Sequence, residues 1–265
     1  MDSLKIIPLK QAEITAPKGI LYMLGEMESL VTAPVFIFFI QGSKKNILVD
    51  AGAPSPGEDG LVQGLPLKGG GVQGTIKALE ELNLKPEDID ILILTHLHYD
   101  HVGTLELFQK ARIYLQKKEW EAAFHPIPIA RGLYLQNLFI KLEKMDTALL
   151  EGTVEIENGI TLFSIPGHAP GQQAVSVKTS QGQTVLAGDH FYSYYNLFPE
   201  TSQLVDLHGK QEPLIPRPDL PFLPPGIHVN LDQWYDSAWK IVSMADSKDL
   251  VIPGHEPSII GKEFL

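Results

Sequence analysis

The chain has 265 residues, and 21 Lys and Arg against 32 Asp and Glu give it a formal net charge of −11. The absence of cysteine excludes disulfides, cysteine-ligated zinc fingers, iron–sulfur clusters and a cysteine nucleophile. The acidic balance argues against a nucleic-acid partner, because affinity for a phosphate backbone comes from Lys and Arg that displace counterions. Nine histidines in such a chain are the unusual feature, and we look for function there.

Short β-branched or aromatic runs bounded by Gly, Pro, Asn or Asp predict strands along the whole chain, with helical patterns between them. The predicted strands are residues 5–9, 35–40, 46–49, 89–94, 113–115, 161–165, 174–178, 184–186 and 250–252. Residues 42–45 are predicted to form a hairpin turn between two of them. The predicted helices are residues 74–82, 117–123, 133–142 and 231–245. This mixture favours an α/β architecture in which helices cover sheets.

We expect one domain over residues 1–265, with a proline-rich insert at 196–226 that extends over the surface. The insert is either passive or a functional loop beside a site. No apolar stretch is long enough to span a membrane, and the first residues show no charged and then apolar leader. We therefore expect a soluble, cytoplasmic protein without a membrane partner.

The densest group of metal-ligand side chains follows the predicted strand at 89–94. His96, His98, Asp100 and His101 place three imidazoles and one carboxylate within six residues. Imidazole nitrogen and carboxylate oxygen suit Zn²⁺ and other divalent first-row ions. His96 and His98 are two residues apart, so an extended backbone points both to one side. A metal site is therefore predicted here.

Three other predicted strands end in a glycine and one further ligand-type side chain. These side chains are His168, Asp189 and His255. The glycine lets the backbone turn sharply without a Cβ clash, and sheet scaffolds usually gather their sites at strand ends. We therefore expect the three side chains to join the first group.

Seven ligands are too many for one tetrahedral ion but suit two. One ion is expected to take His96, His98 and His168, and the other to take Asp100, His101 and His255. Asp189 has two carboxylate oxygens and is expected to bridge them. Zinc is the expected ion, with iron, cobalt and manganese as alternatives, because all of these ions accept nitrogen and oxygen ligands.

These residues resemble the metallo-β-lactamase superfamily. The matching motifs are HxHxDH at 96–101, GHAPG at 167–171, AGD at 187–189 and PGHEP at 253–257. Asp50, in the strand-turn at 48–52, matches an outer partner of the metal site. The resemblance implies an αββα sandwich, in which two mixed sheets pack face to face with helices outside and the metals at one edge. It implies less about the substrate, because the superfamily hosts many hydrolyses.

Differences between this sequence and several branches of the superfamily reduce the number of activities to consider. The commonest zinc β-lactamases use a cysteine ligand, which this chain lacks. Type II glyoxalases carry a helical domain after the last ligand, but only ten residues follow His255 here. The tRNA-processing nucleases fit a chain of charge −11 poorly. Flavodiiron proteins usually have Glu where His98 stands.

The pattern is most similar to N-acyl homoserine lactonases. Tyr192 lies three residues after Asp189, and a Tyr at that offset hydrogen-bonds the lactone carbonyl region in those enzymes. Tyr99 occupies the aromatic position that they use beside the substrate. The spacing of 66 residues from Asp189 to His255 is longer than usual, and the insert supplies the excess. Either tyrosine is also compatible with ordinary packing.

The resemblance therefore predicts a metal-dependent hydrolase that opens a lactone ring, acting on a neutral small molecule such as an N-acyl homoserine lactone. Tyr192 donates a hydrogen bond to the developing oxyanion, and Asp100 passes a proton to the leaving alkoxide. Another ester, a thioester or a phosphodiester is the alternative substrate. The oligomeric state is left open, with a homodimer as one option.

Two further expectations concern residues around this site. Segment 20–24 and the insert residues Phe198, Phe222 and Leu223 either wall an acyl-chain groove or pack normally. Four histidines have no assigned place and are expected at the surface or behind the ligands: His125, His190, His208 and His228. Strand alternation should point His190 away from Asp189.

Overall fold

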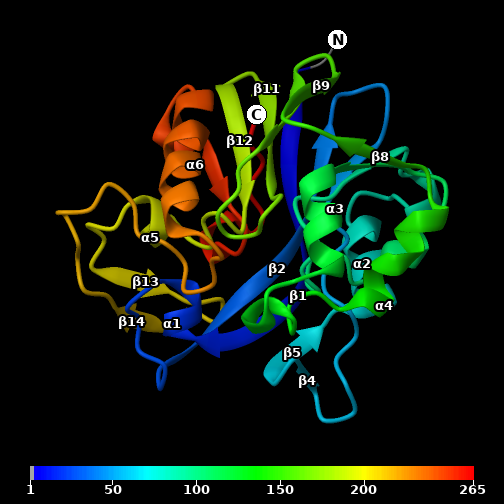
Figure 1. Ribbon diagram of the computed structural model, residues 1–265. Helices are drawn as coiled ribbons and strands as arrows, with labels where there is room; N and C mark the ends of the chain where they lie inside the picture. The colour runs from blue at the N-terminus through cyan, green and yellow to red at the C-terminus, as the bar shows by residue number, and fades with distance from the viewer. Residues whose placement is uncertain (1–2) are drawn as a thin grey trace.

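The structure, a computed structural model, describes residues 3–265 and contains two large β-sheets (Figure 1). The first sheet consists of β1 (Lys5–Pro17), β2 (Leu30–Gln41), β3 (Ile47–Val49), β4 (Leu61–Val62), β5 (Leu65–Gly69), β6 (Ile91–Ile93), β7 (Arg112–Gln116) and β8 (Thr147–Leu150). Its spatial order is β4-β5-β1-β2-β3-β6-β7-β8. The β3, β6, β7 and β8 strands pair in parallel, and β1 and β2 pair antiparallel, so the sheet is mixed.

The second sheet is also mixed. It consists of β9 (Thr153–Glu157), β10 (Ile160–Ser164), β11 (Gln173–Thr179), β12 (Gly182–Gly188) and β15 (Val251–Pro253). The spatial order is β15-β12-β11-β10-β9, and only β12 and β15 pair in parallel. The parallel pair places the ends of β12 and β15, and the residues that follow them, side by side.

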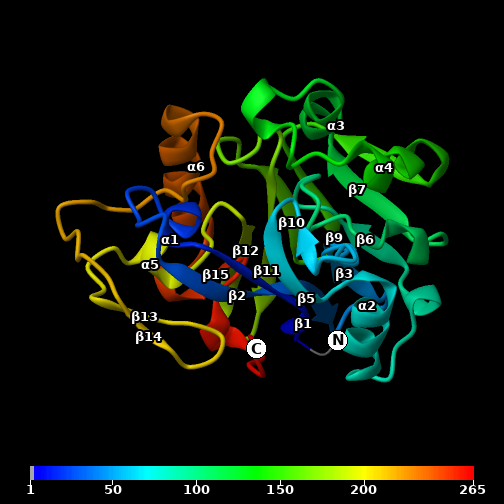
Figure 2. The same cartoon turned by 90° about the horizontal axis from the view of Figure 1, so that it is seen from below.

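Helices cover the outer face of each sheet. The helices of the described residues are α1 (Lys18–Leu21), α2 (Gly71–Glu80), α3 (Lys117–Phe124), α4 (Gln136–Phe139), α5 (Tyr194–Leu197) and α6 (Leu231–Met244), of which α2, α3, α4 and α6 lie on these faces. Figures 1 and 2 show α2, α3 and α4 on the first sheet and α6 on the second. This arrangement confirms the predicted αββα sandwich. Within residues 3–265, no helix is long and apolar enough to cross a membrane.

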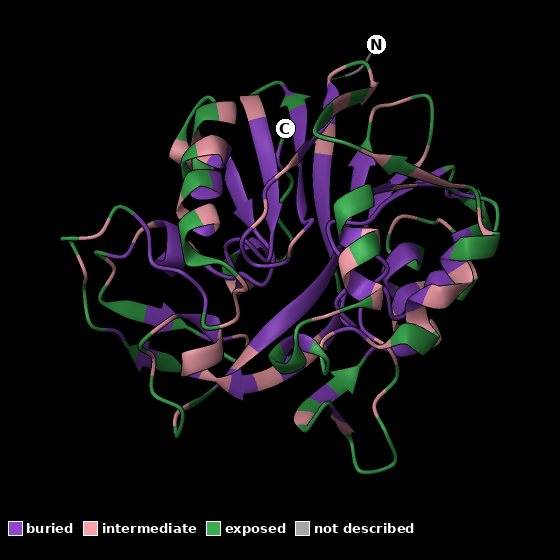
Figure 3. Cartoon of the chain, in the orientation of Figure 1, coloured by how far each residue is buried: buried purple, intermediate pink, exposed green. Residues whose placement is uncertain are grey.

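Strand alternation divides the apolar residues between three layers. In β3, Ile47 and Val49 join a cluster between the two sheets, whereas Leu48 joins the cluster beneath the helices of the first sheet. Trp234 of α6 packs on the outer face of the second sheet. Because both faces of each sheet are covered at its centre, the central strands are continuous apolar runs. Figure 3 shows β2, β11 and β12 largely buried, whereas β5, β8 and β9, at or near the sheet edges, are mostly exposed or half-buried.

The observed elements extend and correct the predicted ones. The turn at 42–45 joins β2 to β3 as expected. β1 and β2 continue well beyond 5–9 and 35–40, because cross-strand pairing overrides the poor β-propensity of segment 10–17. β4, β5, β8 and β9 were not predicted. The helix expected at 133–142 is wrong in its first turn, where the Leu133 carbonyl accepts a hydrogen bond from the Tyr99 amide.

The proline-rich insert is more ordered than predicted. It contains the end of α5 and the hairpin of β13 (Gln203–Val205) and β14 (Gln211–Pro213). The Asn196 side chain donates to the carbonyls of Leu21 and Leu223, and the Gly226 amide donates to the Ile20 carbonyl. The insert therefore closes over the α1 segment and does not simply extend over the surface.

Candidate metal centre

All seven predicted ligands lie together at one edge of the sandwich, where strands of both sheets end. The loop after β6 supplies four of them, and His168, Asp189 and His255 follow β10, β12 and β15. Their ligand atoms form two groups able to hold metal ions. The first group is His96, His98, His168 and Asp189, and the second is Asp100, His101, Asp189 and His255.

The first group is assembled from both sheets. His98 Nδ1 and His168 Nε2 lie 3.1 Å apart. The Oδ2 atom of Asp189 lies 3.7 Å from His96 Nε2 and 3.6 Å from His168 Nε2. One carboxylate oxygen of Asp189 therefore faces three imidazoles.

The second group meets the other oxygen of Asp189. Its Oδ1 atom lies 3.1 Å from the Nε2 atoms of both His101 and His255. Asp100 is slightly farther away, at 3.9 Å from His101 Nε2 and 3.8 Å from His255 Nε2. Asp189 thus lies between the groups with one oxygen toward each, which is the arrangement of a bridging ligand.

The donor set fits two divalent ions. With bonds of 2.0–2.1 Å, neighbouring ligands of a tetrahedral zinc ion lie about 3.3 Å apart, close to the shorter distances here. The Nε2 atoms of His96 and His101 and Oδ1 of Asp189 are buried without a hydrogen-bond partner in the described part of the chain. Because unpaired buried polar atoms are costly, cations bound here would supply the partners that these atoms lack.

Hydrogen bonds on the far side of the rings set which nitrogen faces the centre. Nδ1 of His168 contacts the Ile227 carbonyl at 2.9 Å, and Nδ1 of His255 contacts the Pro34 carbonyl at 2.8 Å. A carbonyl can only accept, so each Nδ1 carries the proton and each Nε2 presents its lone pair. Such outer partners orient metal ligands.

Asp50 is the outer partner of His101. Its Oδ2 atom lies 2.7 Å from His101 Nδ1, and its Oδ1 atom accepts the Thr95 amide at 2.7 Å. The backbone of Asp50 adopts a φ of 63°, in the left-handed region that few non-glycine residues occupy. The position expected for Asp50 from the sequence agrees with this contact.

Burial and neighbouring charges leave four of the predicted ligands in the protonation states that can bind cations. Burial lowers the pKa of His96 and His98 well below the ordinary value and that of His168 to about 4, so all three are neutral near pH 7. Burial opposes ionisation of Asp189, but His101 and His255 outweigh it and lower the pKa of this carboxyl. Metal binding requires these protonation states.

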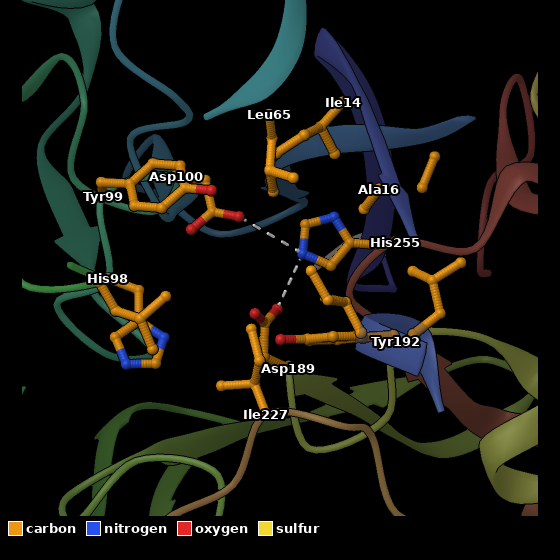
Figure 4. Close-up of a pocket in the computed structure, with 14 residues that line it drawn as sticks. Ile14, Ala16, Leu65, His98, Tyr99, Asp100, Asp189, Tyr192, Ile227 and His255 are labelled. Carbon is orange, nitrogen blue, oxygen red and sulfur yellow. Dashed lines mark ion pairs between the residues drawn. The ribbon is translucent and has the colours of Figure 1, made fainter. Parts of the chain in front are cut away.

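An apolar pocket opens onto the two groups (Figure 4). Its lining consists of Ile14, Ala16, Ile20, Leu21, Ala33, Leu65, His98, Tyr99, Asp100, Leu133, Asp189, Tyr192, Ile227 and His255. No Lys or Arg contributes to this lining among residues 3–265. The pocket is therefore an aliphatic cleft with the ligand cluster at its base.

Both tyrosines singled out from the sequence line this pocket. Tyr192 is buried, and its ring packs edge-on against His168 and His255. Figure 4 shows its hydroxyl beside Asp189. Burial, followed by the charges of Asp189 and Asp100, raises the pKa of Tyr192 well above its ordinary value, so the hydroxyl keeps its proton. It is available as a hydrogen-bond donor.

The expected groove is only partly formed by the residues considered for it. From segment 20–24, Ile20 and Leu21 line the pocket. From the insert, Phe222 packs against α6, and Leu223 is buried in the cluster around α1. Neither of these two residues lines this pocket, but Leu223 lines a second cavity together with Tyr22, Met23 and Leu24 of segment 20–24.

The four unassigned histidines lie outside the metal centre. His190 points away from Asp189 as expected, stacks on Trp234 and contacts its carbonyl at 2.9 Å. Burial lowers the pKa of His190 to about 3. His125 and His208 are exposed, and His228 is half-buried.

Two residues near the centre were missed by the sequence reasoning. Glu119 is fully buried and accepts hydrogen bonds from the Leu97 amide, the Gly171 amide and the Tyr134 hydroxyl. The ring of Tyr134 packs on His98. A Glu in the first turn of a helix looks like a solvated residue favoured by the helix dipole, so the sequence contains no signal for this role.

Comparison with known proteins agrees with this geometry. A family model described as the metallo-beta-lactamase superfamily matches residues 31–255. The N-acyl homoserine lactonase AiiA of Bacillus thuringiensis subsp. kurstaki is 29% identical over 180 residues, which cover 64% of this chain and 69% of the relative.

Solved structures show the same fold. A mutant of B. thuringiensis AiiA with N-decanoyl-L-homoserine at its active site has a TM-score of 0.76 at 22% identity, covering 97% of this chain and 95% of that one. AidC, described as a dizinc quorum-quenching lactonase, has a TM-score of 0.70 at 18% identity, covering 97% of this chain and 89% of that one.

Proposed function

Because the chain belongs to the metallo-β-lactamase superfamily, we propose that it is a dinuclear zinc hydrolase that opens the ring of an N-acyl homoserine lactone. The observation that carries the proposal is the pair of ligand groups sharing Asp189 at the base of an apolar pocket, with Tyr192 beside them. The names of the relatives AiiA and AidC support the choice of a lactone.

The first group would hold one ion through His96, His98 and His168, and the second would hold the other through Asp100, His101 and His255. Asp189 joins the two groups. When bound, a pair of such ions supplies Lewis acidity and lowers the pKa of a metal-bound water molecule to about 7, so that hydroxide is available near neutral pH. The protein's own contribution is to fix the ligands and to exclude bulk water from the pocket.

Tyr192 stabilises the charge that develops on the carbonyl oxygen when water adds to the carbonyl carbon, before the ring opens. Its hydroxyl is protonated, buried and directed toward the ligand cluster. A hydrogen bond to an oxyanion in a poorly solvated site is stronger than the same bond in water. Tyr192 therefore favours the transition state over the bound lactone.

Asp100 transfers a proton from the attacking water to the ring oxygen that leaves. It lines the pocket and lies at the second group, and burial raises the pKa of its carboxyl. A carboxyl group at the base of a substrate pocket can accept a proton and release it again. Asp100 is thus placed to deliver a proton to the ring oxygen that leaves.

The pocket suits a neutral substrate with an aliphatic arm. Ile14, Ile20, Leu65 and Leu133 provide apolar walls. Among the described residues, the lining offers no Lys or Arg to pair with a phosphate or carboxylate group. An acyl chain buries its methylene groups against such walls, at about 0.8 kcal/mol for each.

A substrate panel tests the proposal. The zinc-loaded protein is assayed with acyl homoserine lactones of increasing chain length, bis-p-nitrophenyl phosphate, a thioester and a β-lactam. We expect lactone hydrolysis with kcat/KM increasing as methylenes are added, until the pocket is filled. Hydrolysis of the phosphodiester alone, or of the thioester alone, would contradict the lactone assignment while leaving the dinuclear site intact.

A further inference from the structure

Glu119, in α3, is a fully buried carboxylate that the proposed reaction does not use. Its Oε1 atom accepts hydrogen bonds from the Leu97 amide at 3.1 Å and the Tyr134 hydroxyl at 3.0 Å. Its Oε2 atom accepts the Gly171 amide at 2.9 Å. Three donors aimed at one buried carboxylate form a satisfied polar network, which rigidifies the groups that it joins.

Two of these donors belong to the loops that carry the first ligand group. The Leu97 amide lies between His96 and His98, in the loop after β6 of the first sheet. Gly171 lies three residues after His168, in the loop between β10 and β11 of the second sheet. One carboxylate thus ties together, across both sheets, the backbone that supplies three imidazoles.

The loop of the second sheet approaches α3 very closely. A Cβ atom at Gly171 would clash with the backbone nitrogen of Glu119. The contact between this loop and the start of α3 therefore needs a glycine. The short approach holds the Gly171 amide in reach of the carboxylate.

His98 depends on this network more than the other imidazoles do. His101, His168 and His255 each have an acceptor at Nδ1, but Nε2 of His98 has no partner within residues 3–265. Its ring instead packs edge-on to Tyr134, with centroids 4.8 Å apart. The hydrogen bond from Tyr134 to Glu119 fixes the ring that orients His98.

His101 and His255 of the second ligand group have supports other than Glu119, although Thr95 contacts both His101 and His96 of the first group. His101 is held by Asp50, and His255 by the Pro34 carbonyl. Neither contact involves Glu119. The two groups therefore differ in what holds their ligands in place.

We propose that Glu119 and Tyr134 form a positioning pair that sets the metal affinity of the first group and affects the second, which shares the loop after β6, much less. The inference rests on the proposed dinuclear site, but it does not depend on the substrate being a lactone. Outer partners of metal ligands typically change affinity by roughly 10- to 100-fold, and the structure assigns that effect mainly to one ion of the two.

The test is zinc affinity of the metal-free protein, measured by competition with a chromophoric chelator. His255→Ala impairs the second group and leaves the first, whereas His168→Ala impairs the first and leaves the second. Glu119→Gln is introduced into each background. The matched control is Glu121→Gln, because Glu121 lies on the same helix and is exposed.

In the His255→Ala background, Glu119→Gln should weaken zinc binding by roughly 10- to 100-fold. In the His168→Ala background, it should lower the affinity much less, and Glu121→Gln should have no effect in either. Equal losses in both backgrounds would show that Glu119 supports only the general fold, and no loss in the first background would remove it from the metal site.

Tyr134→Phe keeps the test decisive if Glu119→Gln does not fold, because it removes one hydroxyl and retains the ring. We expect a smaller loss of zinc affinity, mainly in the same background. Circular dichroism of each metal-free variant shows that it is folded before titration. Failure of the lactone assay would not alter either titration, so the two proposals can fail independently.

Discussion

At the scale of single residues, the Asp189 side chain links the two ligand groups. Its two oxygens face different imidazole groups at 3.1–3.7 Å. The glycine before it has a φ of 53° and would place a Cβ against Thr95 and Gln172. A backbone turn at this position therefore requires Gly188, and the turn directs the Asp189 carboxylate between the two groups.

Tyr192→Phe tests the proposed oxyanion donor. Removing one such donor typically lowers kcat by about 100-fold or more, and we expect this loss on the best lactone with little change in KM. Metal content should stay at the wild-type level, because Tyr192 contacts the ligand rings only through packing.

The control for this variant is Tyr194→Phe, two residues away and outside the pocket lining. It should retain wild-type kcat. Wild-type turnover by Tyr192→Phe would assign Tyr192 to packing, which is the ordinary role of a buried aromatic residue.

At the scale of elements, the α1 segment and the β13–β14 hairpin are joined by a buried ion pair. Lys18 Nζ lies 2.7 Å from Glu212 Oε2, and both side chains are almost fully buried. Lys210 also pairs with Glu212. Because α1 supplies pocket residues, this pair connects the proline-rich insert to the wall of the site.

Glu212→Gln should show how strongly this pair holds the insert. Hydrogen bonds from Lys18 and then Lys210 lower the pKa of Glu212 from 4.5 to about 2. A lowered carboxyl pKa stabilises the fold above the ordinary pKa, and this contribution is lost as the pH falls from about 4.5 toward 2. The variant should therefore be less stable near pH 7, by about 3 kcal/mol, and should match the wild type near pH 2.

The measurement is chemical unfolding of both proteins across this pH range. Asp146→Asn is the control, because its ion pair with Arg112 is solvent-exposed and should contribute less than about 1 kcal/mol. A stability difference that is independent of pH would show that the ion pair is not its source.

At the scale of the whole molecule, the metal centre joins the two halves of the sandwich. Its ligands follow strands of both sheets, so bound ions connect the sheets at one edge. A ligand that binds only the folded state stabilises it by mass action. The centre is thus expected to be a structural clamp as well as a catalytic site.

Removing the metal with a chelator measures how much the bound ions stabilise the fold. Removing zinc should lower the Tm by about 10 °C, corresponding to about 4 kcal/mol at a thousandfold excess over Kd. Adding zinc back should restore the original Tm. An unchanged Tm after complete metal removal, verified by elemental analysis, would mean that the ligands are equally well ordered without ions.

The sequence by itself determined the family of folds and predicted which side chains gather at the site. HxHxDH and the glycine–ligand pairs at strand ends are local patterns, because backbone alternation and turns at glycine act within a few residues. The single domain over residues 1–265, the metal-ligand roles of the seven residues, the catalytic roles of Asp100 and Tyr192 and the substrate-binding role of Tyr99 stay predictions.

Only the tertiary structure decided what surrounds these ligands. Pro34 and His255 are 221 residues apart in the chain, and Glu119 meets the loops of both sheets. Likewise, the pocket wall comes from the α1 segment, which the insert holds in place. Such partners are chosen by packing between distant segments. Backbone carbonyls and a helix glutamate carry no pattern in the sequence that marks them in advance.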